Sequence, residues 1–202
     1  MLTFECLCGK TKIHLTTKDH KGRHKVTQRE KGNEKKIPAR KKMGIIFRPI
    51  EEKDNKEIAD LIRTVFREFN IHKPGTVYFD PTTDNLFGLF RTPESEYWIA
   101  EEKGVIIGGC GVYPTPGLPE GCAELVKFYL SASQRGKGIG WQLMGKTFDS
   151  ARKYGYRQLY LESLPELSRA ISLYEKAGFR FIKGPMGNSG HFGCNIWMLK
   201  EL

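Results

Sequence analysis

The sequence of 202 residues has no apolar run long enough to cross a membrane, which takes about 20 residues. Its longest apolar stretch, Val105–Val112, is interrupted by glycines. It also lacks the apolar segment of a signal peptide near the N-terminus, so we expect a cytoplasmic protein that does not contact membranes. Its five cysteines are odd in number and without CxxC spacing, which argues against a disulfide framework and a zinc ribbon.

Acidic residues are too few to balance the basic ones, since 33 Lys+Arg face 23 Asp+Glu. Residues 1–43 carry 13 of the basic and 4 of the acidic residues, so residues 44–202 are nearly neutral. Because residues 1–43 also contain few apolar side chains, we expect a basic, poorly ordered extension followed by one domain at residues 44–202. Two alternatives are non-specific nucleic-acid binding by this extension and an in-frame upstream extension ahead of Met43. Cys6 and Cys8 with nearby histidines have the residue types of a zinc site but not its usual spacing.

Residues 44–202 alternate between strand and helix patterns, which indicates a mixed α/β domain. Apolar residues from Ile58 to Phe69 recur at helical spacing after a D-x-x-E capping box at Asp54. Further helices are expected at residues 84–90, at 139–154 and, after a second capping box at Ser163, at 163–177. Strands are expected at residues 45–50, 97–101, 105–112, 122–130, 157–162, 179–183 and 195–199. Residues 70–95 have the composition of a loop and are expected to form a lid.

A glycine-rich turn at residues 135–140 separates an expected strand from an expected helix, as in anion-binding loops. The Rossmann fingerprint GxGxxG is absent. A Walker A expression matches residues 140–147, but Leu143 and Met144 fall on the apolar stripe of a helix already under way, so we reject it. A third pattern, [Q/R]-x-x-G-x-[G/A], is that of the pyrophosphate loop in acetyl-CoA-dependent transferases, and residues 135–140 fit it.

With this loop and the segment Ala170–Phe179, which fits an A-x-x-L-Y-x-x-x-G-F pattern, the chain resembles the GNAT superfamily of N-acetyltransferases. The resemblance covers residues 44–202 and implies a mixed, mostly antiparallel central sheet flanked by about four helices. It also implies acetyl-CoA as cosubstrate and no metal. Its implied cofactor-binding residues are Phe128, Tyr129, Leu130, Arg135, Gly136, Lys137, Gly138, Ile139, Gly140 and Trp141. One departure is Leu167, where many members carry an asparagine that contacts the cofactor, and Ser168 is a candidate substitute.

The resemblance further places Tyr174 at the usual general acid and Glu124 at the general-base glutamate of histone-acetylating members. The chemistry agrees, because an alkylammonium of pKa about 10.4 must lose a proton before it attacks, and a phenol can protonate a departing thiolate. The alternatives are that Glu124 is solvent-facing or paired with Lys127, and that Tyr174 is only part of an apolar helix stripe. His191 is a minor candidate for the base or for a substrate contact.

The expected function is therefore acetyl transfer from acetyl-CoA to a primary amine. Aromatic residues between Tyr78 and Phe90 suggest a covered pocket, which favours a small-molecule or amino-acid acceptor over a protein lysine or N-terminus. A non-catalytic CoA-sensing module with a nucleic-acid-binding extension is the alternative of another class. A homodimer is left open.

Overall fold

Seven strands form a single sheet in the computed structural model, which describes residues 44–202. They are β1 (Ile46–Pro49), β2 (Glu96–Glu102), β3 (Val105–Tyr113), β4 (Cys122–Leu130), β5 (Gln158–Ser163), β6 (Arg180–Phe181) and β7 (Ile196–Glu201), in the order β1-β2-β3-β4-β5-β7-β6. Every neighbouring pair is antiparallel except β4 and β5. The expected mixed, mostly antiparallel sheet is thus confirmed. The expected basic extension and its candidate zinc ligands lie outside the described residues.

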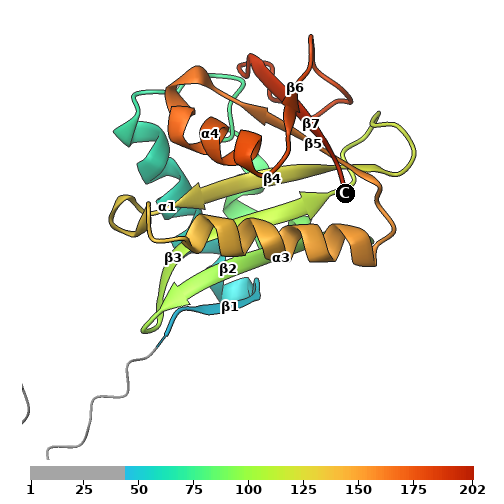
Figure 1. The fold of residues 1–202 in the computed structure, drawn as a ribbon. Helices are drawn as coiled ribbons and strands as arrows, with labels where there is room; N and C mark the ends of the chain where they lie inside the picture. The colour runs from blue at the N-terminus through green and yellow to red at the C-terminus, as the bar shows by residue number, and fades with distance from the viewer. Residues whose placement is uncertain (1–43) are drawn as a thin grey trace, which may run out of the picture. The chain divides into compact units, whose positions relative to one another are not determined.

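Four α-helices accompany the sheet in the described part of the chain: α1 (Asn55–Glu68), α2 (Leu86–Leu89), α3 (Ile139–Lys153) and α4 (Ser168–Lys176). Two separate apolar clusters show that α1 and α3 cover opposite faces, with α3 crossing the sheet in front in Figure 1. Strand alternation explains the division, because Tyr97 and Ile99 of β2 pack with α1 while Ala100 packs with α3. No helix within residues 44–202 is long and apolar enough to cross a membrane.

The parallel strands β4 and β5 pair over only three positions, from Cys122–Gln158 to Glu124–Tyr160. Beyond Glu124, β4 continues along β3 and β5 continues along β7, so the two strands diverge. A register shift between β3 and β4 marks a bulge at Lys127, whose backbone is left-handed at φ 51°. The Tyr97 hydroxyl donates to the Lys127 carbonyl at 2.8 Å and holds the bulge. The divergence opens the sheet at its centre.

Both expected capping boxes are wrong. Asp54 precedes α1, but its carboxylate accepts from Arg48 and from the Glu51 N–H, while Glu57 accepts the N–H of Ile106 in β3 at 2.7 Å. Ser163 is still the last residue of β5, and α4 begins only at Ser168, after a short 3₁₀ turn. In the first case Asp54 binds nearby groups and Glu57 binds a distant strand, and in the second case β5 continues through Ser163.

The segment expected to form a lid is instead packed into the core. A 3₁₀ turn at Pro81–Asn85 leads directly into α2, and Val77, Leu86 and Phe90 are buried in the cluster beneath α1. The Thr83 hydroxyl donates to the Val77 carbonyl at 2.9 Å. Apolar burial therefore fixes this segment against the sheet, close to where β4 and β5 part.

Candidate active site

The glycine turn bends back through left-handed conformations and ends at the first turn of α3. Gly136 and Gly138 have φ of 78° and 79°, and nothing lies within 4 Å of the Cβ that a larger residue would have. Gly138 is the N-cap of α3, so the first N–H groups of the helix have no intrahelical acceptor. Free N–H groups, open space and a helix N-terminus together suit a phosphate.

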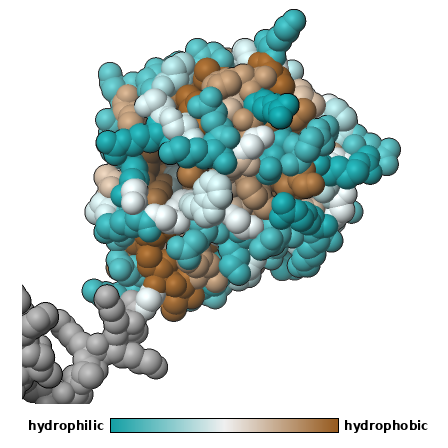
Figure 2. Space-filling view, viewed as in Figure 1, coloured by the Kyte–Doolittle hydropathy of each residue, from teal (hydrophilic) through white to brown (hydrophobic). Residues whose placement is uncertain are grey.

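A cleft of about 440 Å³ adjoins this turn. Eight of the ten predicted cofactor residues line it: Phe128, Tyr129, Leu130, Arg135, Gly136, Gly138, Gly140 and Trp141. The opposite wall comes from α4 and from Leu167 just before it, and in Figure 2 apolar surface lies between hydrophilic residues on the face toward the viewer. One end of the cleft can therefore bind an anion, and the remainder can bind an apolar chain.

Two of the predicted cofactor residues, Arg135 and Lys137, are basic, but neither charge points freely into the cleft. The Arg135 guanidinium is held by the Glu68 carboxylate of α1, at 2.7 Å for one of its two bonds, and by the Leu130 carbonyl at 3.1 Å. Its charge is thus balanced, and it joins the turn to α1. Lys137 is exposed. Arg169 and Lys176 of α4 line the cleft and are the cations that the sequence analysis missed.

Glu124 lies on β4 at the point where β5 diverges, and it is 3% exposed. Its carboxylate accepts the Thr115 hydroxyl. Burial, aided by the negative charge of Glu162, raises the pKa of Glu124 to about 7 despite that hydrogen bond. The expected alternatives do not hold: Glu124 is not solvent-facing, and Lys127 pairs with Asp80 at 2.6 Å.

Tyr174 lies on α4, with its ring between those of Phe128 and Phe179. It is 5% exposed, and burial raises the pKa of its phenol. Its ring is part of the core, as the stripe predicts, yet it also lines the small pocket of about 40 Å³ that contains Glu124. Among the described residues its hydroxyl has no hydrogen-bond partner. Glu124 and Tyr174, 50 positions apart in sequence, therefore meet at one cavity.

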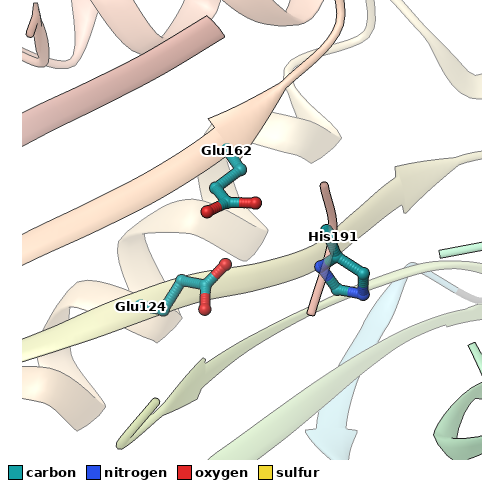
Figure 3. Close-up of side chains that lie close together, drawn as sticks. All are labelled: Glu124, Glu162 and His191. Carbon is teal, nitrogen blue, oxygen red and sulfur yellow. The ribbon is translucent and has the colours of Figure 1, made fainter. Parts of the chain in front are cut away.

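Two further groups face Glu124, as Figure 3 shows: Glu162 of β5 and His191 of the loop before β7. One oxygen of each glutamate and one ring nitrogen of His191 lie within 4.8 Å of one another. Such a set could coordinate a cation, but each member already has a protein partner. Glu162 accepts the hydroxyls of Tyr160 at 2.7 Å and Ser189 at 2.9 Å. The absence of a metal cofactor stays a prediction.

Asp80 is the residue of this site with the weakest sequence signal. It caps the 3₁₀ turn at Pro81–Asn85, and its Oδ2 accepts from the Lys127 ammonium at 2.6 Å and lies 3.1 Å from His191 Nε2. Nothing local in the sequence links residues 80, 127 and 191. Only the packing of the segment before α2 against β4 brings them together.

The three cysteines within residues 44–202 are free thiols, and Cys194 lies partly buried in the loop before β7. Cys110 and Cys122 are buried, and Cys194 lines the small pocket. Burial raises the pKa of Cys194 to about 12, with the charges of nearby glutamates adding to the effect. A thiol with so high a pKa is a poor nucleophile at neutral pH.

Comparison with known proteins agrees with this geometry. The model of the "Acetyltransferase (GNAT) family" matches residues 56–179. The uncharacterized N-acetyltransferase YjgM of Escherichia coli is 35% identical over 158 residues, which are 78% of this chain and 95% of that protein. A GNAT-family acetyltransferase of Staphylococcus aureus Mu50 has a similar fold, with a TM-score of 0.71 at 20% identity over 78% of this chain and 99% of its own. PaiA N-acetyltransferase of Thermoplasma acidophilum, solved in complex with coenzyme A, has a TM-score of 0.63 at 19% identity over 79% of this chain and 100% of its own.

Proposed function

The chain belongs to the GNAT family of acetyltransferases, and we propose that it moves the acetyl group of acetyl-CoA directly to the primary amine of a small molecule or amino acid. The observation that carries the proposal is the pairing of Glu124, whose pKa is about 7, with Tyr174 at one small cavity. A carboxyl group of that pKa is half ionised near neutral pH, which suits a general base. The cytoplasm is the proposed compartment.

The cleft beside the glycine turn offers anion-binding groups and an apolar wall, which suits acetyl-CoA. Free N–H groups at Gly138 and the start of α3 would hold the pyrophosphate, and Arg169 and Lys176 offer charge to further phosphates. The unpaired edge of β4 at Phe128–Leu130 would receive the amides of the pantetheine arm. Coenzyme A is present in the structure of the similar Thermoplasma protein, which supports this use of the cleft.

In the proposed mechanism Glu124 accepts one proton and Tyr174 donates another. Glu124 takes a proton from the acceptor ammonium, and the free amine attacks the thioester carbonyl carbon. The C–N bond forms as the C–S bond breaks, and the second proton of the nitrogen is lost. Tyr174 donates a proton to the departing thiolate and is restored by that second proton. The products are the amide, CoA thiol and one proton released from Glu124.

The size of the cavity limits the group that reaches Glu124 to a slender primary amine. The cavity beside Glu124, of about 40 Å³, has room for an amino group and ordered water but not for a bulky group. The packed segment before α2, including Val77, closes one side of it. A slender primary amine meets these limits, whereas a folded protein surface would reach Glu124 only through a lysine side chain or a free N-terminus.

The test is release of CoA thiol from acetyl-CoA with a panel of amines, amino acids, polyamines and peptides. We expect turnover with one class of small primary amine, and its loss in Glu124→Gln. Turnover with peptides alone would replace the small acceptor by a protein. Tight acetyl-CoA binding without transfer to any acceptor, together with salt-sensitive DNA binding, would favour the CoA-sensing alternative.

A further inference from the structure

Glu124 must give up a proton in every catalytic cycle, yet its carboxyl group has very little contact with solvent. Its side chain is buried, and so is that of Thr115, its hydrogen-bond donor. Glu162 faces it but already accepts two hydroxyl groups. The remaining neighbour that can accept a proton is His191. Its ring is 13% exposed, and the next residue, Phe192, is 84% exposed.

The orientation of His191 follows from its partner. Oδ2 of Asp80 lies 3.1 Å from Nε2 and also accepts the Lys127 ammonium, while Oδ1 accepts the backbone N–H and hydroxyl of Thr82. Burial alone would raise the pKa of Asp80, but its hydrogen bond with His191 and the charge of Lys127 hold that pKa well below its usual range. Asp80 is thus an ionised acceptor, so Nε2 must carry the hydrogen.

With its hydrogen on Nε2, the neutral ring leaves the Nδ1 lone pair free. Figure 3 shows that nitrogen turned toward the carboxylates of Glu124 and Glu162. The charged groups around the ring are therefore Asp80 from the segment before α2, Lys127 and Glu124 from β4, and Glu162 from β5. The Nδ1 lone pair is therefore placed to accept a proton from the side of Glu124.

From this geometry we infer that His191 relays the proton of Glu124 to solvent and that Asp80 positions His191 for the relay. The O–H bond of Glu124 breaks as an N–H bond forms at Nδ1, directly or through one water in the small cavity, and the imidazolium then loses a proton to solvent. His191 acts through Glu124, and Asp80 acts through His191, so both are positioning residues. The inference rests on the proposed function.

The test is chemical rescue of His191→Ala with imidazole. We expect kcat at pH 7 to fall about 10²-fold, as for loss of a positioned proton-transfer group, and to recover in proportion to added imidazole. The acceptor KM and the melting temperature should change little. His72→Ala is the matched control, because His72 is exposed and its ring contacts Tyr78, away from the cluster. It should keep full activity and show no imidazole effect.

Asp80→Asn examines the positioning step, since an amide can donate to Nε2 and so favour the wrong tautomer. We expect kcat to fall about 10–100-fold, the usual cost of losing such a supporting partner. If that variant unfolds because Lys127 loses its counter-ion, the His191→Ala rescue decides alone. Unchanged kcat in His191→Ala, or a loss that imidazole does not restore, would overturn the relay. A wild-type protein that transfers no acetyl group would instead overturn the proposed function.

Discussion

Replacing Glu124 by glutamine should remove a pH-dependent loss of folding stability. The pKa of Glu124 is about 7 in the folded chain, against an ordinary 4.5. Between these values the folded chain holds a proton that the unfolded chain has released, so the free energy of unfolding falls as pH rises. At about 1.4 kcal/mol per pKa unit, the fall amounts to about 3 kcal/mol. Glutamine cannot ionise, so Glu124→Gln should gain about 3 kcal/mol relative to wild type between pH 4 and pH 8.5.

The same substitution should have the opposite effect on catalysis. Wild-type kcat/KM should rise with pH through about 7, as Glu124 ionises, and then level off. Glu124→Gln should lose about 10²–10⁴-fold near pH 7. It should recover part of this loss at high pH, because the free amine then becomes available without a base. Acetyl-CoA binding should persist, since Glu124 does not line the cleft beside the glycine turn.

Two measurements check this account: urea unfolding at a series of pH values, and the pH profile of kcat/KM. Glu120→Gln is the matched control, because Glu120 is an exposed glutamate in the turn before β4 and should change neither. Near-wild-type activity of Glu124→Gln at pH 7 would refute the role as base. If Glu124→Gln is no more stable than wild type at high pH, then ionisation of Glu124 does not lower the free energy of unfolding, and its pKa is not raised in the folded chain.

Three further predictions concern the cofactor cleft, the acid and the N-terminal extension. Gly138→Asp should abolish acetyl-CoA binding in calorimetry while far-UV circular dichroism stays native, because the added carboxylate enters open space beside the phosphate site. Gly145→Asp, in equally open surroundings on α3, should still bind. Tyr174→Phe keeps the packed ring and should lower kcat about 10²-fold at unchanged melting temperature, and unchanged kcat would leave Tyr174 a core residue. Deleting residues 1–42 should leave melting temperature and acetyl-CoA affinity unchanged, and a loss of either would show that the extension supports the fold.

Sequence reasoning predicted those parts of the fold that depend on local periodicity. Strand β4 begins and ends at the predicted residues, and the apolar stripe of α1 is buried at Ile58, Ile62, Val65 and Phe66. The start of α4 was wrong, because Ser163 is needed in β5 to pair with Ile196. The segment before α2 was misjudged because its loop-like composition gives no sign that Val77 and Leu86 are buried. Tertiary contacts decided both cases.

The same distinction between local patterns and tertiary contacts applies to the residues of the site. Glu124, Tyr174 and the glycine turn were predicted because each belongs to a local pattern. Glu162 and Asp80 were missed because their partners are distant in sequence: Ser189 lies 27 positions from Glu162, and His191 lies 111 from Asp80. The guanidinium of Arg135 likewise meets Glu68, 67 positions earlier. Periodicity and motif spacing cannot predict contacts between residues so far apart in the sequence.

Because β4 and β5 pair over only three positions, an unpaired strand edge lies in the middle of the sheet. After Glu124, β4 has a strand partner on the β3 side only, so the backbone groups on its other side are open to whatever enters the cleft. Elsewhere, open edges invite other polypeptides to add a strand. Here the edge lies in the cleft between α4 and the glycine turn, which suits an extended molecule with amide groups of its own. On the proposed assignment, acetyl-CoA acts as a missing strand. It should slow amide hydrogen exchange along Phe128–Leu130 and stabilise the fold by about 2.7 kcal/mol at a hundredfold excess over its Kd.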